Sequence, residues 1–192
     1  MCWAALDRGI TIAEQSLRQA PLERWRNERD KIRRRIERDG YDSERGIFVQ
    51  AFGGGELDSA LLLLPDIGFV AWDDERMART VDAVRDELEV DGLLLRYRVD
   101  SRLQGADTER EGAFLACSFW LAECLARQGR HTDAQDVFDR AAACGNDLGL
   151  FAEEYDPERG EMLGNFPQGL THLSHISAAV AIAQPTGRGL VR

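Results

Sequence analysis

Two adjacent carboxylates stand in the stretch 151–156, which reads Phe-Ala-Glu-Glu-Tyr-Asp. In a loop between helices, Glu153 and Glu154 could divide the work of sugar hydrolysis, one as a base and the other as a ligand of the sugar. Acidic loops are common. On these residues alone, a solvated turn that ends at Asp156-Pro157 is the simpler interpretation.

Similar side chains recur in three long segments that separate apolar stretches. The first segment contains Tyr41, Asp42, Phe48, Gln50, Phe52 and Gly53 to Gly55; the second contains Arg96, Tyr97, Arg98, Asp100 and Arg102; the third contains Glu153, Glu154, Tyr155, Asp156 and Asn165. Aromatic faces stack on sugar rings, and charged groups bind sugar hydroxyls. This composition is suited to a carbohydrate site.

Apolar residues between these segments recur at the spacing of α-helices. The predicted helices contain Trp3 to Leu17, Leu22 to Ile36 after Pro21, Glu56 to Leu64 before Pro65, Met77 to Leu88 after Asp73 or Asp74, Phe114 to Leu125, Ala134 to Ala141, and Leu170 to Val180. Capping boxes predict the start of the fifth helix at Thr108 with Glu111, and of the sixth at Thr132 with Gln135. The chain is therefore expected to be all-α.

The connections between these helices alternate in length. Those after the first, third and fifth helices have roughly 2 to 9 residues, and those after the second, fourth and sixth have roughly 18 to 20. Helices joined by short loops run antiparallel, so the long loops should emerge on one face of the array. These long loops are expected to carry function and no secondary structure of their own. An α/α toroid or solenoid fits this pattern.

Composition excludes some classes of protein. The chain has 192 residues, 44% of them apolar, and a net charge of −10, which disfavours a nucleic acid partner and favours solubility. No apolar stretch approaches the ~20 residues of a membrane span, and no signal peptide opens the chain, so a cytoplasmic location is expected. Cys2, Cys117, Cys124 and Cys144 are interpreted as small core residues in a reducing compartment.

The stretch 151–156 resembles the base-bearing motif of glycoside hydrolase family 15, the glucoamylase-like family. The resemblance extends, in family order, to Met1-Cys2-Trp3-Ala4-Ala5-Leu6-Asp7-Arg8, Leu57-Asp58-Ser59-Ala60-Leu61-Leu62 with Pro65, Glu111-Gly112-Ala113-Phe114 through Cys117-Ser118-Phe119-Trp120-Leu121, and Gly164-Asn165-Phe166-Pro167-Gln168 with Thr171-His172-Leu173. These segments cover nearly the whole chain to about Ile182.

The resemblance implies an (α/α)6 toroid of the six-hairpin glycosidase type, of which this chain is about half. Residues 1–183 would form the C-terminal half of the catalytic domain, and residues 184–192 a tail. The activity implied is inverting hydrolysis of α-linked glucose, in maltooligosaccharides or in trehalose, with no metal and no organic cofactor.

The resemblance also assigns roles to individual residues. Glu153 would be the general base and Glu154 a sugar ligand, joined by Glu111, Arg98 and Asp58 as substrate-binding residues. Glu111 is either a substrate ligand or only a capping-box carboxylate. The sugar-binding arginine is Arg98 or Arg102, and Asp58 either lies near the sugar or supports a loop at the start of a helix.

The family's catalytic acid lies in a Trp-Glu motif upstream of the segment that begins here at Met1, and nothing resembling it exists in this chain. The N-terminal half of the barrel is therefore the expected partner. Alone, the chain is expected to be incomplete and inactive. Half a toroid would also leave apolar surface exposed at Trp3, at Leu6 and along Leu170 to Val180.

Other residue patterns have structural interpretations. Phe119 and Trp120 are expected in the core rather than as sugar platforms. His172 and His175 lie three residues apart without a carboxylate partner at metal-ligand spacing, so they are expected to pack within a helix.

Two other functions remain open at this point. The chain could be a catalytically inactive half-barrel that acts as a carbohydrate-binding or assembly module, or a helical-repeat scaffold unconnected with sugars.

Overall fold

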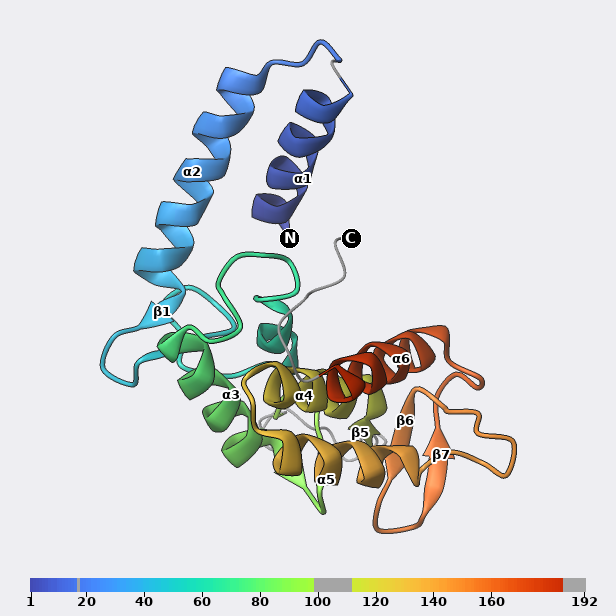
Figure 1. Ribbon diagram of the computed structural model, residues 1–192. Helices are drawn as coiled ribbons and strands as arrows, with labels where there is room; N and C mark the ends of the chain where they lie inside the picture. Colours follow the sequence, from blue (N-terminus) through green and yellow to red (C-terminus); the bar gives the residue numbers. More distant parts are fainter. Residues whose placement is uncertain (17, 99–111, 185–192) are drawn as a thin grey trace.

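The computed structural model describes residues 1–16, 18–98 and 112–184, and these residues are mostly helical (Figure 1). The helices are α1 (Cys2–Gln15), α2 (Leu22–Asp39), the 3₁₀ helix η1 (Ser59–Leu63), α3 (Glu75–Leu88), α4 (Leu115–Arg127), α5 (His131–Ala142) and α6 (Gly169–Ala183). They correspond in order to the seven helices predicted from the sequence. The helix α6 ends at Ala183, and residues 185–192 of the predicted tail lie outside the described residues.

Helix starts agree only partly with the sequence signals. Asp74 caps α3 as expected, because its side chain accepts a hydrogen bond from the Arg76 amide at 2.9 Å. The capping box at Thr132 was wrong: α5 begins at His131, and no side chain caps it. The described part of α4 begins at Leu115, four residues after Glu111, because Ala113–Phe114 form a strand instead.

The helix α4 lies at the centre of the core. Its residues are buried on nearly all sides, and it packs against α5, α6, α3, η1 and the strand β4 (Leu93–Leu94). Phe119 is completely buried and contacts Phe138 of α5 and Phe151 edge-on, with ring centroids 5.6 Å and 5.5 Å away. Trp120 is half-buried, and its indole donates a hydrogen bond to the Ser174 hydroxyl of α6. The prediction that both residues belong to the core is confirmed.

The helices α1 and α2 form a hairpin that extends away from the α3–α6 body in Figure 1. The hairpin is attached through Trp3, which is 6% exposed and meets Phe69 edge-on at 5.2 Å. The guanidinium of Arg33, on α2, lies over both rings. The expectation that Trp3 exposes apolar surface was therefore wrong, because Phe69 and Arg33 cover it within this chain.

Three of the four cysteines are core residues, as predicted. Cys117, Cys124 and Cys144 are buried, and burial raises the pKa of the Cys124 thiol far above its ordinary value and that of Cys144 to about 11. Cys2 does not fit the prediction, because it is exposed at the start of α1.

The long connections contain short β-hairpins, contrary to the expectation that they lack secondary structure. The strands β1 (Tyr41–Asp42) and β2 (Ile47–Phe48) pair after α2, β3 (Glu89–Val90) and β4 pair after α3, and β6 (Glu154–Asp156) and β7 (Glu161–Leu163) pair after α5. The strand β5 (Ala113–Phe114) joins the last pair, in the order β5-β6-β7.

Two of these hairpins share one sequence and one geometry. Residues 41–46 read Tyr-Asp-Ser-Glu-Arg-Gly, and residues 155–160 read Tyr-Asp-Pro-Glu-Arg-Gly. In each, the aspartate Oδ1 accepts from the amides two and three residues later, and the glycine has a positive φ, 72° at Gly46 and 69° at Gly160. An Asx turn followed by a left-handed glycine thus closes both hairpins.

The three long connections also contact one another. The first meets the second through the backbone pair of Asp58 with Tyr97 and through Ser59, whose amide donates to the Arg96 carbonyl at 2.8 Å. The second meets the third through β5 and β6, where Ala113 pairs with Tyr155 and Phe114 with Glu154. The described parts of the three long connections therefore lie side by side, in agreement with the prediction that they emerge on one face.

Candidate active site

The backbone of Glu153 is fixed between a helix start and a turn. Its carbonyl accepts from the Leu115 amide, the first of α4, at 3.2 Å, and its amide donates to the Asn165 carbonyl at 2.9 Å. The segment 153–156 lies beside β5 on one side and continues into the β6–β7 hairpin, whose return strand leads directly to Gly164 and Asn165. The hairpin register therefore places Asn165 beside Glu153, twelve residues away in the chain.

The side chain of Glu153 is half-buried and hydrogen-bonded. Its Oε2 accepts from the Asn165 side-chain Nδ2 at 2.8 Å and from the Asn165 amide at 3.2 Å. Gly164 approaches the same carboxylate with φ 72°, and a Cβ there would lie 3.0 Å from Oε2. The sequence indicates only that Asn165 belongs to the third long connection; its contact with Glu153 depends on the hairpin register, which the sequence does not reveal.

The neighbouring carboxylate, Glu154, contacts a different segment. It opens β6, opposite Phe114 on β5 and Leu163 on β7. Its Oε2 accepts from the Gly112 amide at 2.9 Å. Adjacent residues of an extended chain point to opposite sides. The two carboxylates therefore have different hydrogen-bond partners.

Two of the other sequence candidates have structural partners. Asp58 caps η1: its Oδ1 accepts from the Ala60 amide at 2.7 Å, and its Oδ2 from the Gln50 side chain at 3.4 Å. This is the role of a helix-start carboxylate. Arg98 is exposed, and its guanidinium donates to the carbonyl of Glu87 on α3. Glu111 and Arg102 lie outside the described residues.

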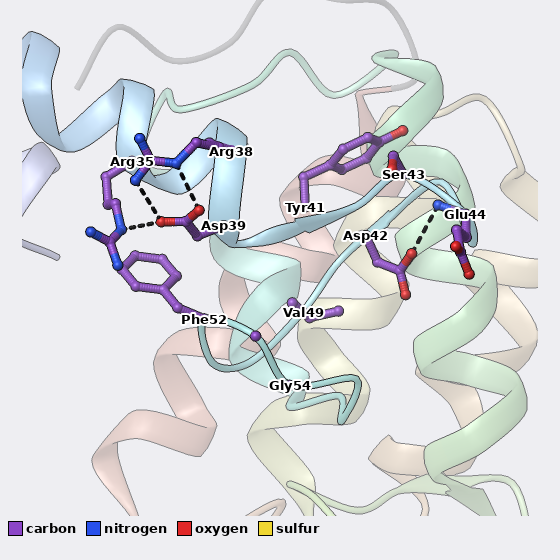
Figure 2. Close-up of a pocket in the computed structure, with 11 residues that line it drawn as sticks. Arg35, Arg38, Asp39, Tyr41, Asp42, Ser43, Glu44, Val49, Phe52 and Gly54 are labelled. Carbon is purple, nitrogen blue, oxygen red and sulfur yellow. Dashed lines mark hydrogen bonds and ion pairs between the residues drawn. The ribbon is translucent and has the colours of Figure 1, made fainter.

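The first long connection forms an open groove of about 650 Å³ at the end of α2 (Figure 2). Its lining includes Tyr41, Asp42, Phe52 and the glycines at 53 and 54, so these polar and aromatic residues of the sequence prediction do gather. Two guanidinium groups enter it, Arg35 and Arg38, and both pair with Asp39. Phe48 is 1% exposed and belongs to the core instead.

The two histidines of α6 pack as predicted rather than pairing with acids. His172 accepts from the Phe151 amide through Nε2 at 3.4 Å, and its Nδ1 lies 2.7 Å from the Gln168 carbonyl. His175 stacks on Phe138 and also contacts Phe119 and Phe151. Burial lowers the pKa of His175, and the charge of His172 lowers it further.

The outer face of α6 is apolar and open to solvent. Leu170, Leu173 and Ile176 follow one side of the helix and are 44%, 66% and 57% exposed. This stripe is the apolar surface predicted for the last helix. In the described ranges, no helix is long and apolar enough to cross a membrane.

The amino-acid sequence of this chain is similar to that of a known protein family. The family model described as glycosyl hydrolases family 15 matches residues 1–180. The trehalase of Mycobacterium tuberculosis is 43% identical over 182 residues, covering 95% of this chain and 26% of that protein. The trehalase of Thermoplasma volcanium is 39% identical over 180 residues, covering 93% and 28%. The chain thus spans about a quarter of the length of these relatives.

Solved structures agree on the fold. A wild-type glycosidase superposes with a TM-score of 0.74 at 22% sequence identity, covering 94% of this chain and 51% of its own. The E335A variant of a glycosidase, solved in complex with glucose, gives the same values. The described helices therefore correspond to about half of a glycosidase fold, and the predicted half of an (α/α)6 toroid is confirmed.

Proposed function

Because the chain belongs to glycosyl hydrolases family 15, we propose that it supplies the general base of an enzyme that hydrolyses α-glucosidic bonds with inversion. Glu153 is the proposed base. The observation that supports this role is its placement: a half-buried carboxylate at the end of a hairpin, held by backbone and side-chain bonds on the face of the long connections.

In the proposed reaction, Glu153 accepts a proton from a water molecule as the water oxygen bonds to the anomeric carbon. The bond from that carbon to the leaving oxygen breaks on the opposite face, and a carboxylic acid protonates the leaving oxygen. Inversion needs the two carboxyl groups about 6.5–9.5 Å apart, with room for the water. Glu154 is bonded to Gly112 rather than placed across from Glu153, so we assign it to the sugar.

We assign the acid to the N-terminal half of the barrel, which acts as the partner of this chain. Two observations support this assignment. The chain covers only 51% of the glycosidase with which it superposes, and the α6 stripe of Leu170, Leu173 and Ile176 is apolar and exposed. An exposed apolar stripe of this kind is characteristic of an interface.

The substrate is α-linked glucose, in trehalose or in maltooligosaccharides. Trehalose is the first to test, because the curated relatives from Mycobacterium tuberculosis and Thermoplasma volcanium are trehalases. Of the substrate-binding candidates, Glu154 and Glu111 remain proposed sugar ligands. For Asp58 and Arg98, the contacts with Ala60 and Glu87 favour a supporting role.

A chimeric trehalase tests the proposal. In it, this chain replaces the matching segment of the Mycobacterium tuberculosis trehalase, which is 43% identical. We expect glucose release from trehalose, with one β-glucose for each α-glucose in early ¹H NMR spectra, as inversion requires. Glu153→Gln should reduce kcat at least ~10³-fold while leaving sugar binding largely intact, because the amide keeps the shape but cannot take the proton.

Two results would change the assignment. A Glu153→Gln chimera with substantial turnover would move the base elsewhere, first to Glu154. Full hydrolysis by the isolated chain would show that no acid from a partner is needed. If the chimera binds trehalose but never turns it over, the chain is a carbohydrate-binding or assembly module instead.

A further inference from the structure

We propose that Asn165 is the positioning residue for Glu153, holding Oε2 so that Oε1 is the oxygen that takes the proton of the attacking water. This inference rests on the proposed function and adds to it a second residue and the reacting atom. It starts from an asymmetry in the carboxylate: both of its hydrogen bonds from Asn165 reach the same oxygen.

An ionised carboxylate has about two acceptor sites on each oxygen. The Asn165 Nδ2 and amide groups, at 2.8 Å and 3.2 Å, supply two donors to Oε2. Among the described residues, no donor reaches Oε1. A carboxylate with one oxygen engaged and the other open has a defined orientation and one defined place for a water molecule.

The contact is built into the backbone as well as the side chains. The Glu153 amide donates to the Asn165 carbonyl at 2.9 Å, so three hydrogen bonds join the two residues. Gly164 completes the enclosure, since any Cβ there would lie 3.1 Å from the Glu153 Cβ. Asn165 therefore restrains the carboxylate on one side, and the backbone of Gly164 restrains it on another.

Such restraint matters for a base that must meet a water in one geometry. A general base works only within hydrogen-bond reach of the proton it accepts, and small misplacements of a reacting group cost up to ~100-fold in rate. In the step itself, the O–H bond of the water breaks, its proton goes to Oε1, and its oxygen bonds to the anomeric carbon as the bond from that carbon to the leaving oxygen breaks and the acid protonates that oxygen.

The test uses the chimera, with Asn165→Ala and Asn165→Asp. We expect kcat to fall ~10–100-fold with little change in KM, because the ground-state sugar contacts remain. In Asn165→Asp, where a carboxylate is added beside that of Glu153, the acidic limb of the pH–rate profile should also move to higher pH. A purely structural loss would not move this limb.

Asn146→Ala is the matched control. Asn146 lies in the same connection, and its Oδ1 accepts from the amides of Leu148 and Leu150 at 3.0 Å and 2.9 Å. Its loss should lower the melting temperature without shifting the pH–rate profile. In the isolated chain, the Asn165 side-chain amide protons should move upfield in NMR spectra when Glu153 is replaced by Ala, because the hydrogen bond to Oε2 is lost.

The outcomes separate the two proposals. If Asn165→Ala keeps the wild-type kcat and Asn165→Asp keeps the wild-type acidic limb while Glu153→Gln is inactive, Glu153 stands as the base and the positioning role of Asn165 is wrong. If Glu153→Gln remains active, the proposed function fails, whatever Asn165 does. Unchanged Asn165 amide shifts in the isolated Glu153→Ala chain would refute the contact itself.

Discussion

The imidazole of His175 lies nearly parallel to the ring of Phe138, with centroids 5.0 Å apart and planes 28° apart. This pair joins α6 to α5, and Phe119 and Phe151 close the same cluster. The helix α6 therefore packs through one titratable ring that contacts three aromatic rings.

The stability of the chain should fall as the pH drops below about 6.5. Burial lowers the pKa of His175 below its ordinary value of 6.5, so the unfolded state takes up the proton first and is favoured as the pH falls. Thermal denaturation at pH 7.5 and pH 5.5 measures this, with His175→Phe as the variant that should lose most of the difference. If the stability of His175→Phe depends on pH as strongly as that of the wild type, groups other than His175 cause the dependence.

Trp3→Ala should destabilise the chain by about 3–5 kcal/mol, because it leaves a cavity against Phe69. Trp3→Phe should cost much less, since it keeps a ring there and removes an indole Nε1 that has no hydrogen-bond partner among the described residues. Urea denaturation of both variants tests the pair. A Trp3→Ala chain as stable as wild type would mean that the α1–α2 hairpin is not anchored here.

The isolated chain should self-associate through the α6 stripe. Leu173→Glu with Ile176→Glu should shift it toward monomer in size-exclusion chromatography with light scattering, because charges disrupt an apolar contact. Leu148→Glu is the control, since Leu148 is 77% exposed but lies in the connection after α5, outside the stripe. A wild-type chain that is already monomeric at high concentration would contradict this prediction.

Gly164→Ala should destabilise the chain by about 1–2 kcal/mol, because φ is 72° there. It should also reduce turnover in the chimera, since the new Cβ would press on the Glu153 carboxylate. Gly169→Ala serves as the comparison: nothing lies within 4 Å of its Cβ position, and it begins α6, so we expect equal or higher stability. Equal melting temperatures for the two variants would refute the close approach at Gly164.

Substitutions of Asp58 can distinguish a helix-capping role of this residue from a sugar-binding role. Asp58→Asn keeps an acceptor for the Ala60 amide and should retain stability and trehalose hydrolysis, whereas Asp58→Ala should lose about 1 kcal/mol. The measurements are denaturation of the chain and KM of the chimera. A large rise in KM for Asp58→Asn at unchanged stability would return Asp58 to the substrate site.

The helices and their order could be predicted from the sequence, because the periodicity of apolar residues reflects which side of a helix is buried. The clearest case is α4, since residues 114–125 are mostly apolar and almost all of them are buried. Helix starts could be predicted less well. The box at Thr132 failed, because α5 begins at His131 and its N-cap residue is Arg130, two residues before Thr132, with no side-chain cap. A capping motif states only a local preference, and tertiary packing decides where a helix begins.

The candidate site was predicted in part. Glu153 and Glu154 could be selected by residue type and by their resemblance to a motif. The contact between Glu153 and Asn165 could not, because it depends on the register of the β6–β7 hairpin, and the connections were expected to contain no strands. From the sequence, Arg98 or Arg102 could be the sugar-binding arginine, and Asp58 could bind the sugar or support a helix start; only the structure gives Arg98 and Asp58 their partners in α3 and η1.

The repeated hairpins at 41–46 and 155–160 give the chain two copies of one scaffold around two different carboxylates. Two residues before the shared tyrosine stands Asp39 in one copy, neutralised by Arg35 and Arg38, and Glu153 in the other, where its partner is an uncharged amide. The same hairpin scaffold thus carries a carboxylate paired with guanidinium groups in one copy and the proposed base, paired with an amide, in the other. If Glu153 is the base, as proposed, arginines introduced beside it should reduce turnover in the chimera while leaving the carboxylate itself in place.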